Sequence, residues 1–335
     1  MSKNYYSRIR NKLDRMYTDI RFNAGLYRPR GNGKGILMYH GVDKTGNKRF
    51  NQRFVGSGDF ERQLVYFKKY MNVLSVEDYF ERKFVNDKIN IAITFDDGYA
   101  NNFKYALPLL EKHRVPASFF ITGFNPAGLD ILWPDFLDIA GSLTDKDEVN
   151  IDGDLFNKVG NRWYLKKDGK ALHDIIKEKG VYEYKQRAMD AIQKITPDFK
   201  HIEEYFDYWK LMSDEEIILA SRSPYITIGS HGYYHNNLGN IPLEDAAAEL
   251  SRSKTYLEEL IQKPVNTLSY PDGSYSRELI SEASNMGFKY QLATRYYISS
   301  EDKSDNRIEN RYGIFMTYST ANTLRAFEKN INSLL

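Results

Sequence analysis

The stretch Ile91-Ala92-Ile93-Thr94-Phe95-Asp96-Asp97-Gly98 is an apolar run that ends abruptly in two carboxylates and a glycine. Its β-branched and aromatic residues are typical of a buried strand. Side chains of a regular strand alternate between two faces, so adjacent aspartates can serve one site only where the strand breaks into a turn. Gly98 permits such a turn. The stretch therefore predicts a buried strand with a polar site at its end, although Asp-Asp-Gly is also typical of a simple polar turn.

Similar apolar runs recur along the chain, with helical patterns between several of them. We predict strands over residues 36–40, 71–76, 91–95, 117–122, 226–230, 267–270 and 290–294. We predict helices over residues 59–70, 101–113, 243–262 and 276–286, with Asp59 and Ser276 as N-caps and Gly287 after the last of them. Alternation of strands and helices favours an α/β fold with parallel strands.

The alternation weakens between about residues 124 and 221, where charged residues are frequent and a helical pattern covers residues 171–195. This region is interpreted as a largely helical insertion that forms a lid or a substrate arm, or alternatively as a part of the core. A closing helix is predicted near the C-terminus. The predicted organisation is an arm over residues 1–34, a domain over residues 35–318 that contains the insertion, and a C-terminal helix over residues 319–335.

Composition limits the chemistry that the chain can use. The 335 residues are 41% hydrophobic and 27% charged, which is ordinary for a globular protein. There is no cysteine. A disulfide framework, a thiolate metal site and a cysteine nucleophile are therefore all excluded, and any metal site must use histidine, aspartate and glutamate.

The N-terminal 34 residues are strongly basic, with nine Lys or Arg against two Asp, while the whole chain has a net charge of only +2. Ile9, Leu13, Met16 and Ile20 recur at helical spacing, which predicts a basic amphipathic helix. The helix is either a solvated arm packed on its own domain or a peripheral contact with an anionic membrane. No nucleic-acid partner is expected. Because the arm lacks the long apolar stretch of a secretory signal, we expect a cytoplasmic location, at the inner membrane surface in the second case.

A second polar motif, Ser230-His231-Gly232-Tyr233-Tyr234-His235, also follows an apolar run. Histidines four residues apart lie on one face of a helical turn, which suits two imidazoles that bind one ion. Two histidines and one aspartate form a three-ligand site with open positions for water and substrate. The second aspartate is then free to take a proton from that water. Together, the two motifs predict metal-assisted hydrolysis.

The sequence Thr94-Phe95-Asp96-Asp97-Gly98 and the His231–His235 pair resemble the first two motifs of the polysaccharide deacetylases with a NodB-type domain, carbohydrate esterase family 4. The resemblance covers about residues 35–123 and 224–316. It implies a distorted (β/α) barrel and a divalent metal, most often Zn²⁺. It also implies that Asp96 is the general base and that Asp97, His231 and His235 are the metal ligands.

The sequence Leu268-Ser269-Tyr270-Pro271-Asp272-Gly273 resembles the third motif of this family, which forms a wall of the active-site groove. The resemblance places Tyr270 and Pro271 against the substrate. It also implies that a backbone N–H near Asp272 stabilises the oxyanion together with the metal. Without the other motifs, the same residues would predict only a proline–glycine turn.

The third motif departs from the family pattern at two positions. Ser269 stands where many members have an arginine that orients the base, and Asp272 stands where an aromatic residue is common. Another group must therefore hold Asp96 if the chain is active. Arg311 is the candidate.

Many members of the family also have a late histidine as the general acid, but the last histidine of this chain is His235. Tyr39-His40 resembles instead an N-terminal Tyr-His of the subset that includes poly-N-acetylglucosamine deacetylases. This resemblance implies that His40 protonates the leaving amine, a role that suits histidine near neutral pH. Tyr99 is a candidate for stacking on a sugar face.

These motifs predict a metal-dependent deacetylase that removes an N-acetyl group from an amino sugar in a glycan or glycan precursor and releases acetate. With no export signal recognised, a lipid-linked or nucleotide-linked precursor fits better than a mature wall polymer. Two alternatives stay open. One is an O-acetyl esterase or another amide hydrolase on the same scaffold. The other is a non-catalytic sugar-binding relative, which the departure at Ser269 and the missing late histidine favour.

Overall fold

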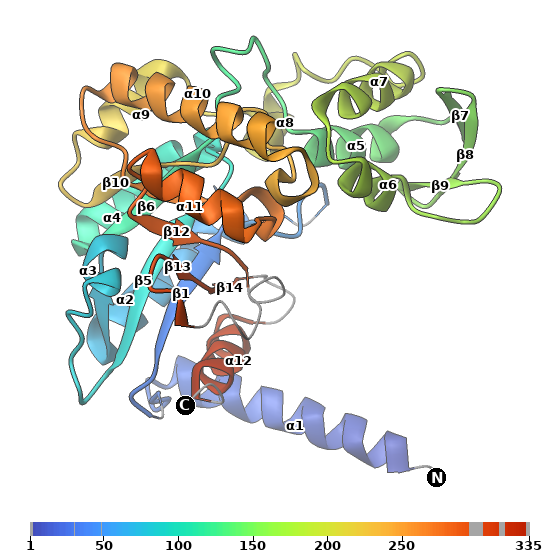
Figure 1. Cartoon of the computed structure of the whole chain (residues 1–335). Coiled ribbons are helices and arrows are strands. Elements are labelled where there is room, and N and C mark those ends of the chain that lie inside the picture. The colour runs from blue at the N-terminus through green and yellow to red at the C-terminus, as the bar shows by residue number, and fades with distance from the viewer. Residues whose placement is uncertain (1–2, 30, 48, 295–303, 315–318, 333–335) are drawn as a thin grey trace.

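The computed structural model describes residues 3–29, 31–47, 49–294, 304–314 and 319–332. In this part of the chain a parallel sheet curls into a nearly closed barrel with helices around it (Figure 1). The strands run in the order β13-β12-β11-β10-β6-β5-β1-β14, and β4 pairs with β5 outside this path. The bounds are β1 Lys34–Tyr39, β4 Met71–Leu74, β5 Ile89–Phe95, β6 Ala117–Ile121, β10 Ile226–Ser230, β11 Thr267–Ser269, β12 Tyr290–Leu292, β13 Ile308–Glu309 and β14 Arg311–Gly313. This architecture confirms the predicted α/β barrel.

The first and last strands of this order, β13 and β14, are separated along the chain by Asn310 alone. The final segment of the sheet therefore brings its two ends close together. β5 is buried along its whole length, as expected for a central strand of a parallel sheet. A separate short parallel pair is formed by β2 (Val42–Asp43) and β3 (Val55–Gly56).

Helices cover the outside of the barrel (Figure 1). Their bounds are α2 Ser57–Tyr70, α3 Val76–Phe80, α4 Leu107–His113, α9 Asp214–Ser221, α10 Leu243–Ile261 and α11 Arg277–Asn285, with a π-helical turn Asn102–Ala106 before α4 and 3₁₀ turns Leu238–Asn240 and Pro271–Gly273. The Ser276 side chain caps α11 by accepting a hydrogen bond from the Leu279 N–H, as predicted.

Several predicted boundaries differ from the observed ones. The strand predicted over 71–76 ends at Leu74, because the Ser75 side chain accepts a bond from the Asp78 N–H and starts α3. Asp59 is not an N-cap, since α2 begins two residues earlier, after Gly56. The short strands β13 and β14 were not predicted, because two or three residues carry no periodicity.

The predicted insertion is largely helical, but it also contains strands that were not predicted. Between its helices lies an antiparallel three-stranded sheet, whose residues alternate between buried and exposed. Its elements are α5 Trp133–Leu143, β7 Glu148–Ile151, β8 Asp154–Val159, β9 Arg162–Leu165, α6 Leu172–Lys179, α7 Tyr182–Gln193 and α8 Glu203–Trp209. Phe136, Phe156, Trp163 and Ile192 form an apolar cluster that also includes Phe54 from beside the barrel. The insertion thus has its own core, which continues into the domain.

Two helices lie at the termini, α1 (Lys3–Asn23) and α12 (Thr320–Asn332). Leu324, Phe327 and Ile331 of α12 are buried on one face, as predicted for the closing helix. Gly35 of β1 allows this close packing, because a Cβ there would lie 2.7 Å from the Ile331 side chain. None of the helices in the described ranges is both long enough and apolar enough to cross a membrane.

Candidate metal centre

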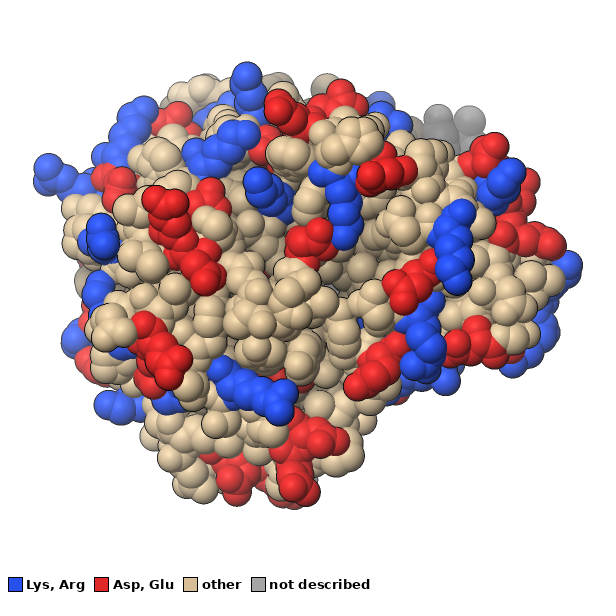
Figure 2. Space-filling model, turned by 90° about the horizontal axis from the view of Figure 1, so that it is seen from above, with Lys and Arg blue, Asp and Glu red and all other residues tan. Residues whose placement is uncertain are grey.

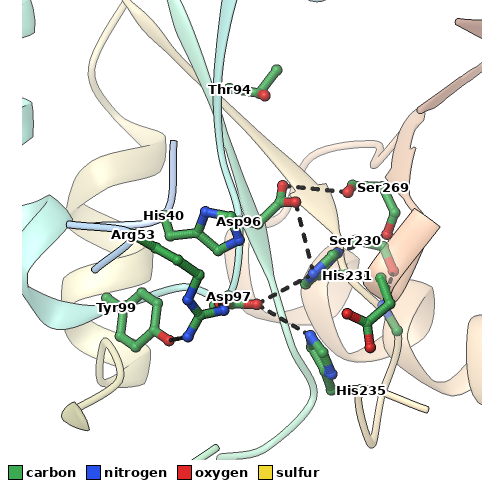
Figure 3. A network of polar contacts seen from close by, with 12 residues as sticks. His40, Arg53, Thr94, Asp96, Asp97, Tyr99, Ser230, His231, His235 and Ser269 are labelled. Carbon is green, nitrogen blue, oxygen red and sulfur yellow. Dashed lines mark hydrogen bonds and ion pairs between the residues drawn. The ribbon is translucent and has the colours of Figure 1, made fainter. Parts of the chain in front are cut away.

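The polar motifs meet at the rim where the parallel strands end (Figure 3). β5 ends at Phe95, and Asp97 and Gly98 have φ values of 75° and 76°. This left-handed backbone breaks the strand, as the adjacent aspartates predicted, and directs both carboxylates toward one cavity. His231 follows β10 directly, two strands away in the sheet.

Asp97, His231 and His235 are buried, and their ligand atoms all lie within 4.8 Å of one another. The Asp97 Oδ1 atom is 3.3 Å from His231 Nε2 and 3.2 Å from His235 Nε2. The His231 Nδ1–H donates to the Ser269 carbonyl at 2.8 Å, which leaves the Nε2 lone pair directed at Asp97. Two imidazole nitrogens and one carboxylate oxygen are a donor set that suits a divalent ion such as Zn²⁺. The residues therefore fit the expected metal.

The histidines converge through a loop and not through a helical turn, which corrects the predicted local geometry. Gly232 and His235 have φ values of 74° and 51°. The loop closes around the buried carboxylate of Glu249 on α10. Its Oε1 accepts from the backbone N–H groups of Tyr233 at 3.1 Å and Tyr234 at 2.9 Å, and from that of Asn236 at 3.3 Å.

A buried cation from the insertion holds the other side of this loop. Lys185 on α7 is 1% exposed, and its Nζ donates to the His235 carbonyl at 2.7 Å and to Asn236 Oδ1 at 3.0 Å. Burial lowers the pKa of Lys185 to about 8. Sequence reasoning missed both Lys185 and Glu249. Each is a charged residue at a core-facing helical position, and that is the signal that could have revealed them.

Asp96 is held by Arg311, which reaches it from β14. The guanidinium makes two parallel bonds to the carboxylate, from Nη1 to Oδ1 and from Nη2 to Oδ2, both 2.7 Å. Arg311 Nη2 also donates to Ser269 Oγ at 2.7 Å, so the serine that replaces the family arginine lies beside the arginine that reaches Asp96. Burial by itself raises the pKa of Asp96, but the charges of Arg311 and His231 outweigh it and lower the pKa below its usual value.

A second arginine, Arg53, contacts Asp97 from the other side (Figure 3). Its guanidinium is 3.4 Å from Asp97 Oδ2 and 3.0 Å from both Asp135 Oδ1 and the Tyr99 hydroxyl oxygen. The Tyr99 hydroxyl donates to Asp135 at 2.6 Å, and burial raises the pKa of Asp135 to about 7. Arg53 has no motif around it, so no signal in the sequence pointed to it.

Three residues expected at the substrate are placed elsewhere. Tyr99 and Tyr270 are 0% exposed, so neither ring is available to a sugar. Tyr99 supports Asp135 instead, and the Tyr270 hydroxyl donates to Gln291 at 2.6 Å. Pro271 is buried as well and packs behind Gly232. Gly232 belongs to the loop over residues 231–236 that carries both histidines, here called the metal loop. All three side chains are directed into the core, Tyr99 after β5 and Tyr270 and Pro271 after β11.

A cavity of about 820 Å³ opens over the carboxylates and histidines. His40 lines it beside Asp96 and Arg53 (Figure 3). Its Nδ1 is buried without a hydrogen-bond partner among the described residues. Burial and the charge of Arg53 lower the pKa of His40 to about 4. Asp272 is also in the wall, with φ 54° and its carboxylate 2.7 Å from Lys177 Nζ.

The insertion forms one wall of this cavity. Its contribution comes from Trp133, Asn161, Arg162, His173 and Lys177. Lys177 pairs with Asp272, which follows β11 of the barrel. The insertion therefore contributes to the wall of the cavity, and its role as a lid or substrate arm stays a prediction.

The family model described as polysaccharide deacetylase matches residues 85–133 and 195–291, which include both carboxylates and both histidines of the site. In these two segments the chain is similar to the polysaccharide deacetylases. The Streptococcus pyogenes deacetylase PplD in complex with acetate is 17% identical, with 89% of this chain and 98% of that chain covered and a TM-score of 0.50. IcaB from Ammonifex degensii is also 17% identical, with 90% and 100% covered and a TM-score of 0.52. These likenesses concern the fold, which is of the NodB type. No curated protein matches the chain in sequence.

The family match does not extend over the whole candidate site. His40, Arg53 and Arg311 lie outside the matched segments, although all three line the same cavity. The roles expected for His40 and Arg311 are therefore still predictions, supported here by their positions.

Proposed function

We propose that the chain is a metal-dependent hydrolase that removes the N-acetyl group of an amino sugar in a glycan or glycan precursor and releases acetate. The observation that supports this most strongly is the difference between two adjacent carboxylates. Asp97 lies 3.3 and 3.2 Å from the Nε2 atoms of His231 and His235, whereas Asp96 is held by two bonds from Arg311, lies 3.9 Å from His231 Nε2 and faces the same cavity. A ligand and a separate ionised base at one site are what hydrolysis by an activated water requires.

Asp97, His231 and His235 would hold the metal. When bound, a divalent metal supplies Lewis-acid polarisation of the acyl oxygen and lowers the pKa of water. Asp96 accepts the proton of the attacking water. Its lowered pKa keeps it ionised near pH 7, and the two bonds from Arg311 fix its orientation.

His40 donates a proton to the leaving nitrogen. With its pKa lowered to about 4, the ring is neutral before the reaction. Negative charge that develops on the substrate during attack raises the pKa of the ring, so His40 takes up a proton from solvent and passes it to the leaving nitrogen as the C–N bond breaks. The backbone N–H of Asp272, in the cavity wall, stabilises the oxyanion. We also propose that the substrate is a cytoplasmic lipid-linked or nucleotide-linked precursor.

The test is acetate release by the purified full chain, with added zinc and with a chelator. The panel contains N-acetylglucosamine oligomers, nucleotide-linked N-acetyl sugars, a lipid-linked analogue and an O-acetyl ester. Asp96→Asn should retain the metal and lose about 10²- to 10⁴-fold in turnover, since it removes only the general base. Asp87→Asn, the same change at an exposed aspartate, is the matched control and should leave turnover unchanged.

Metal-dependent release from an N-acetyl sugar, lost in Asp96→Asn, supports the proposal. Release from the ester alone would assign the site to an esterase. Protein that holds metal but releases no acetate from any substrate would contradict the deacetylase assignment, and protein that binds no metal would favour a non-catalytic sugar-binding role.

A further inference from the structure

Helix α1 contacts the rest of the chain through its polar face and, near its C-terminal end, through Phe22, whose ring centroid lies 5.5 Å from that of Tyr66. Asp14 is 3.4 Å from Arg325 on α12, and Asp19 accepts from the Asn322 side chain at 3.0 Å. Between them along the helix, Thr18 is 4% exposed. The polar residues of α1 thus face its own domain, which reverses the usual arrangement of a surface helix.

The opposite face of α1 is an exposed apolar stripe. Ile9, Leu13, Met16 and Ile20 recur every three or four residues, which places them along one side of the helix. They are 41%, 59%, 51% and 64% exposed, and Tyr17 beside them is 61% exposed. No segment in the described part of the chain covers this stripe. Figure 1 shows α1 running past α12 and beyond the edge of the barrel.

The charged residues of α1 are also divided between the side that faces the domain and the exposed side. Its two acidic residues, Asp14 and Asp19, are both used in the contacts with α12. Arg8, Arg10 and Lys12 are exposed and flank the apolar stripe. The face shown in Figure 2, by contrast, has basic and acidic side chains interspersed. The outward side of α1 therefore combines apolar and basic side chains without a balancing acidic one.

We propose that α1 docks the protein on the surface of an anionic lipid bilayer. An amphipathic helix of this kind lies in the plane of the interface, with its apolar stripe among the acyl chains and its cations at the phosphate headgroups. The contacts of α1 with α12 keep the domain attached to the docked helix. This surface is separate from the metal centre, so the inference does not depend on the proposed reaction.

A second copy of the chain fits the stripe less well than a bilayer does. Two α1 helices packed in parallel along their stripes would bring Arg8, Arg10 and Lys12 of each copy close to those of the other. Repulsion between these like charges opposes such a dimer, whereas anionic headgroups attract them.

The experiment is co-sedimentation of the full chain with vesicles of phosphatidylcholine alone and of phosphatidylcholine mixed with phosphatidylglycerol. The wild-type chain should sediment with the anionic vesicles, and less so as salt is added. Combining Leu13→Ser, Met16→Ser and Ile20→Ser should lower the partition coefficient by at least about tenfold. Combining Arg8→Gln, Arg10→Gln and Lys12→Gln should remove the preference for anionic vesicles.

The matched control combines Val65→Ser, Val159→Ser and Leu219→Ser, three apolar residues that are 50%, 66% and 42% exposed outside α1. It should bind vesicles like the wild type. The proposal is overturned if the wild-type chain stays in the supernatant, or if the stripe variant sediments as well as the control. It is also overturned if light scattering shows a dimer that depends on the stripe while vesicle binding is absent, because the partner would then be a second copy.

Discussion

At the scale of single residues, Asp96 and Asp97 show how neighbours acquire different roles. Their side chains are chemically the same, but the left-handed backbone at Asp97, with φ 75°, gives the two carboxylates different surroundings. Asp97 lies against two imidazoles, and Asp96 lies against a guanidinium. Burial costs a carboxylate several kcal/mol unless it is paired, so each partner is needed to keep its aspartate ionised.

Arg311→Met should expose this dependence. Without the guanidinium, the charge of His231 alone opposes most of the effect of burial, so the pKa of Asp96 rises and its orientation is lost. We expect turnover to fall about 10²-fold or more while metal content is unchanged. The acidic limb of the pH–rate profile should also move to higher pH. Arg307→Met, in the same segment but paired with Asp305, is the control. A variant that keeps the wild-type pH profile would exclude Arg311 as the residue that positions the base.

His173 links pH to stability. Burial and the charge of Arg162 lower its pKa in the folded chain to about 4, from an ordinary value of 6.5. At pH values between about 4 and 6.5, the His173 imidazole is therefore protonated in the unfolded chain but neutral in the folded chain. The folded state therefore loses stability as pH falls, by at most about 1.4 kcal/mol per pH unit.

His173→Asn should remove this contribution, so the difference in unfolding free energy between about pH 7 and about pH 4.5 should shrink. Urea unfolding at the two pH values measures it. His201→Asn, at a histidine whose side chain is 72% exposed, is the control and should behave like the wild type. Equal pH dependence in His173→Asn and the wild type would contradict the buried, neutral histidine.

At the scale of elements, the metal loop is shaped by helices on both sides of it. Glu249 on α10 accepts its N–H groups, and Lys185 on α7 donates to its carbonyl. A loop with left-handed residues at Gly232 and His235 has no regular hydrogen bonding of its own. These two buried charges therefore replace the ladder bonds that a helix or a strand would provide.

Lys185→Met nearly keeps the length of the side chain but removes the ammonium group and both of its hydrogen bonds. Because supporting contacts of metal ligands contribute strongly to affinity, we expect the metal dissociation constant to rise about 10-fold or more. Titration against a zinc chelator of known affinity measures the change. Lys194→Met, at an exposed lysine after the same helix, should leave the affinity unchanged. An unchanged affinity in Lys185→Met would show that the insertion covers the site without organising it.

At the scale of the whole molecule, the metal centre joins distant parts of the chain. Asp97 follows β5, and the histidines follow β10, with the whole insertion between them in sequence. A ligand that binds only where these segments meet stabilises the folded state by mass action, by about 2.7 kcal/mol when its concentration is 100 times its dissociation constant.

Removal of the metal with a chelator should therefore lower the melting temperature, and re-addition of zinc should restore it. Differential scanning calorimetry checks this. Asp97→Ala, which removes one ligand, should melt at a temperature that neither zinc nor chelator changes. If zinc raised the melting temperature of Asp97→Ala as much as that of the wild type, the ion would be binding elsewhere.

The sequence by itself determined the features that depend on local patterns. The strands around 91–95 and 226–230, the helices over 243–262 and 276–286, and the two polar motifs follow from composition and spacing, which are local properties. The grouping of Asp97, His231 and His235 was also predictable, because the ends of parallel strands meet at one rim of the barrel.

Only the tertiary structure decided which residues support that group. Arg53, Lys185 and Glu249 reach the site from a loop and from two helices, and Tyr99 and Tyr270 turn into the core, away from the cavity. The strands of the insertion and the outward stripe of α1 were likewise not decided by pattern. Helical periodicity shows that a helix has an apolar side, but which side meets the domain depends on contacts such as Asp14 with Arg325. Those contacts join residues hundreds of positions apart, and local sequence carries no information about them.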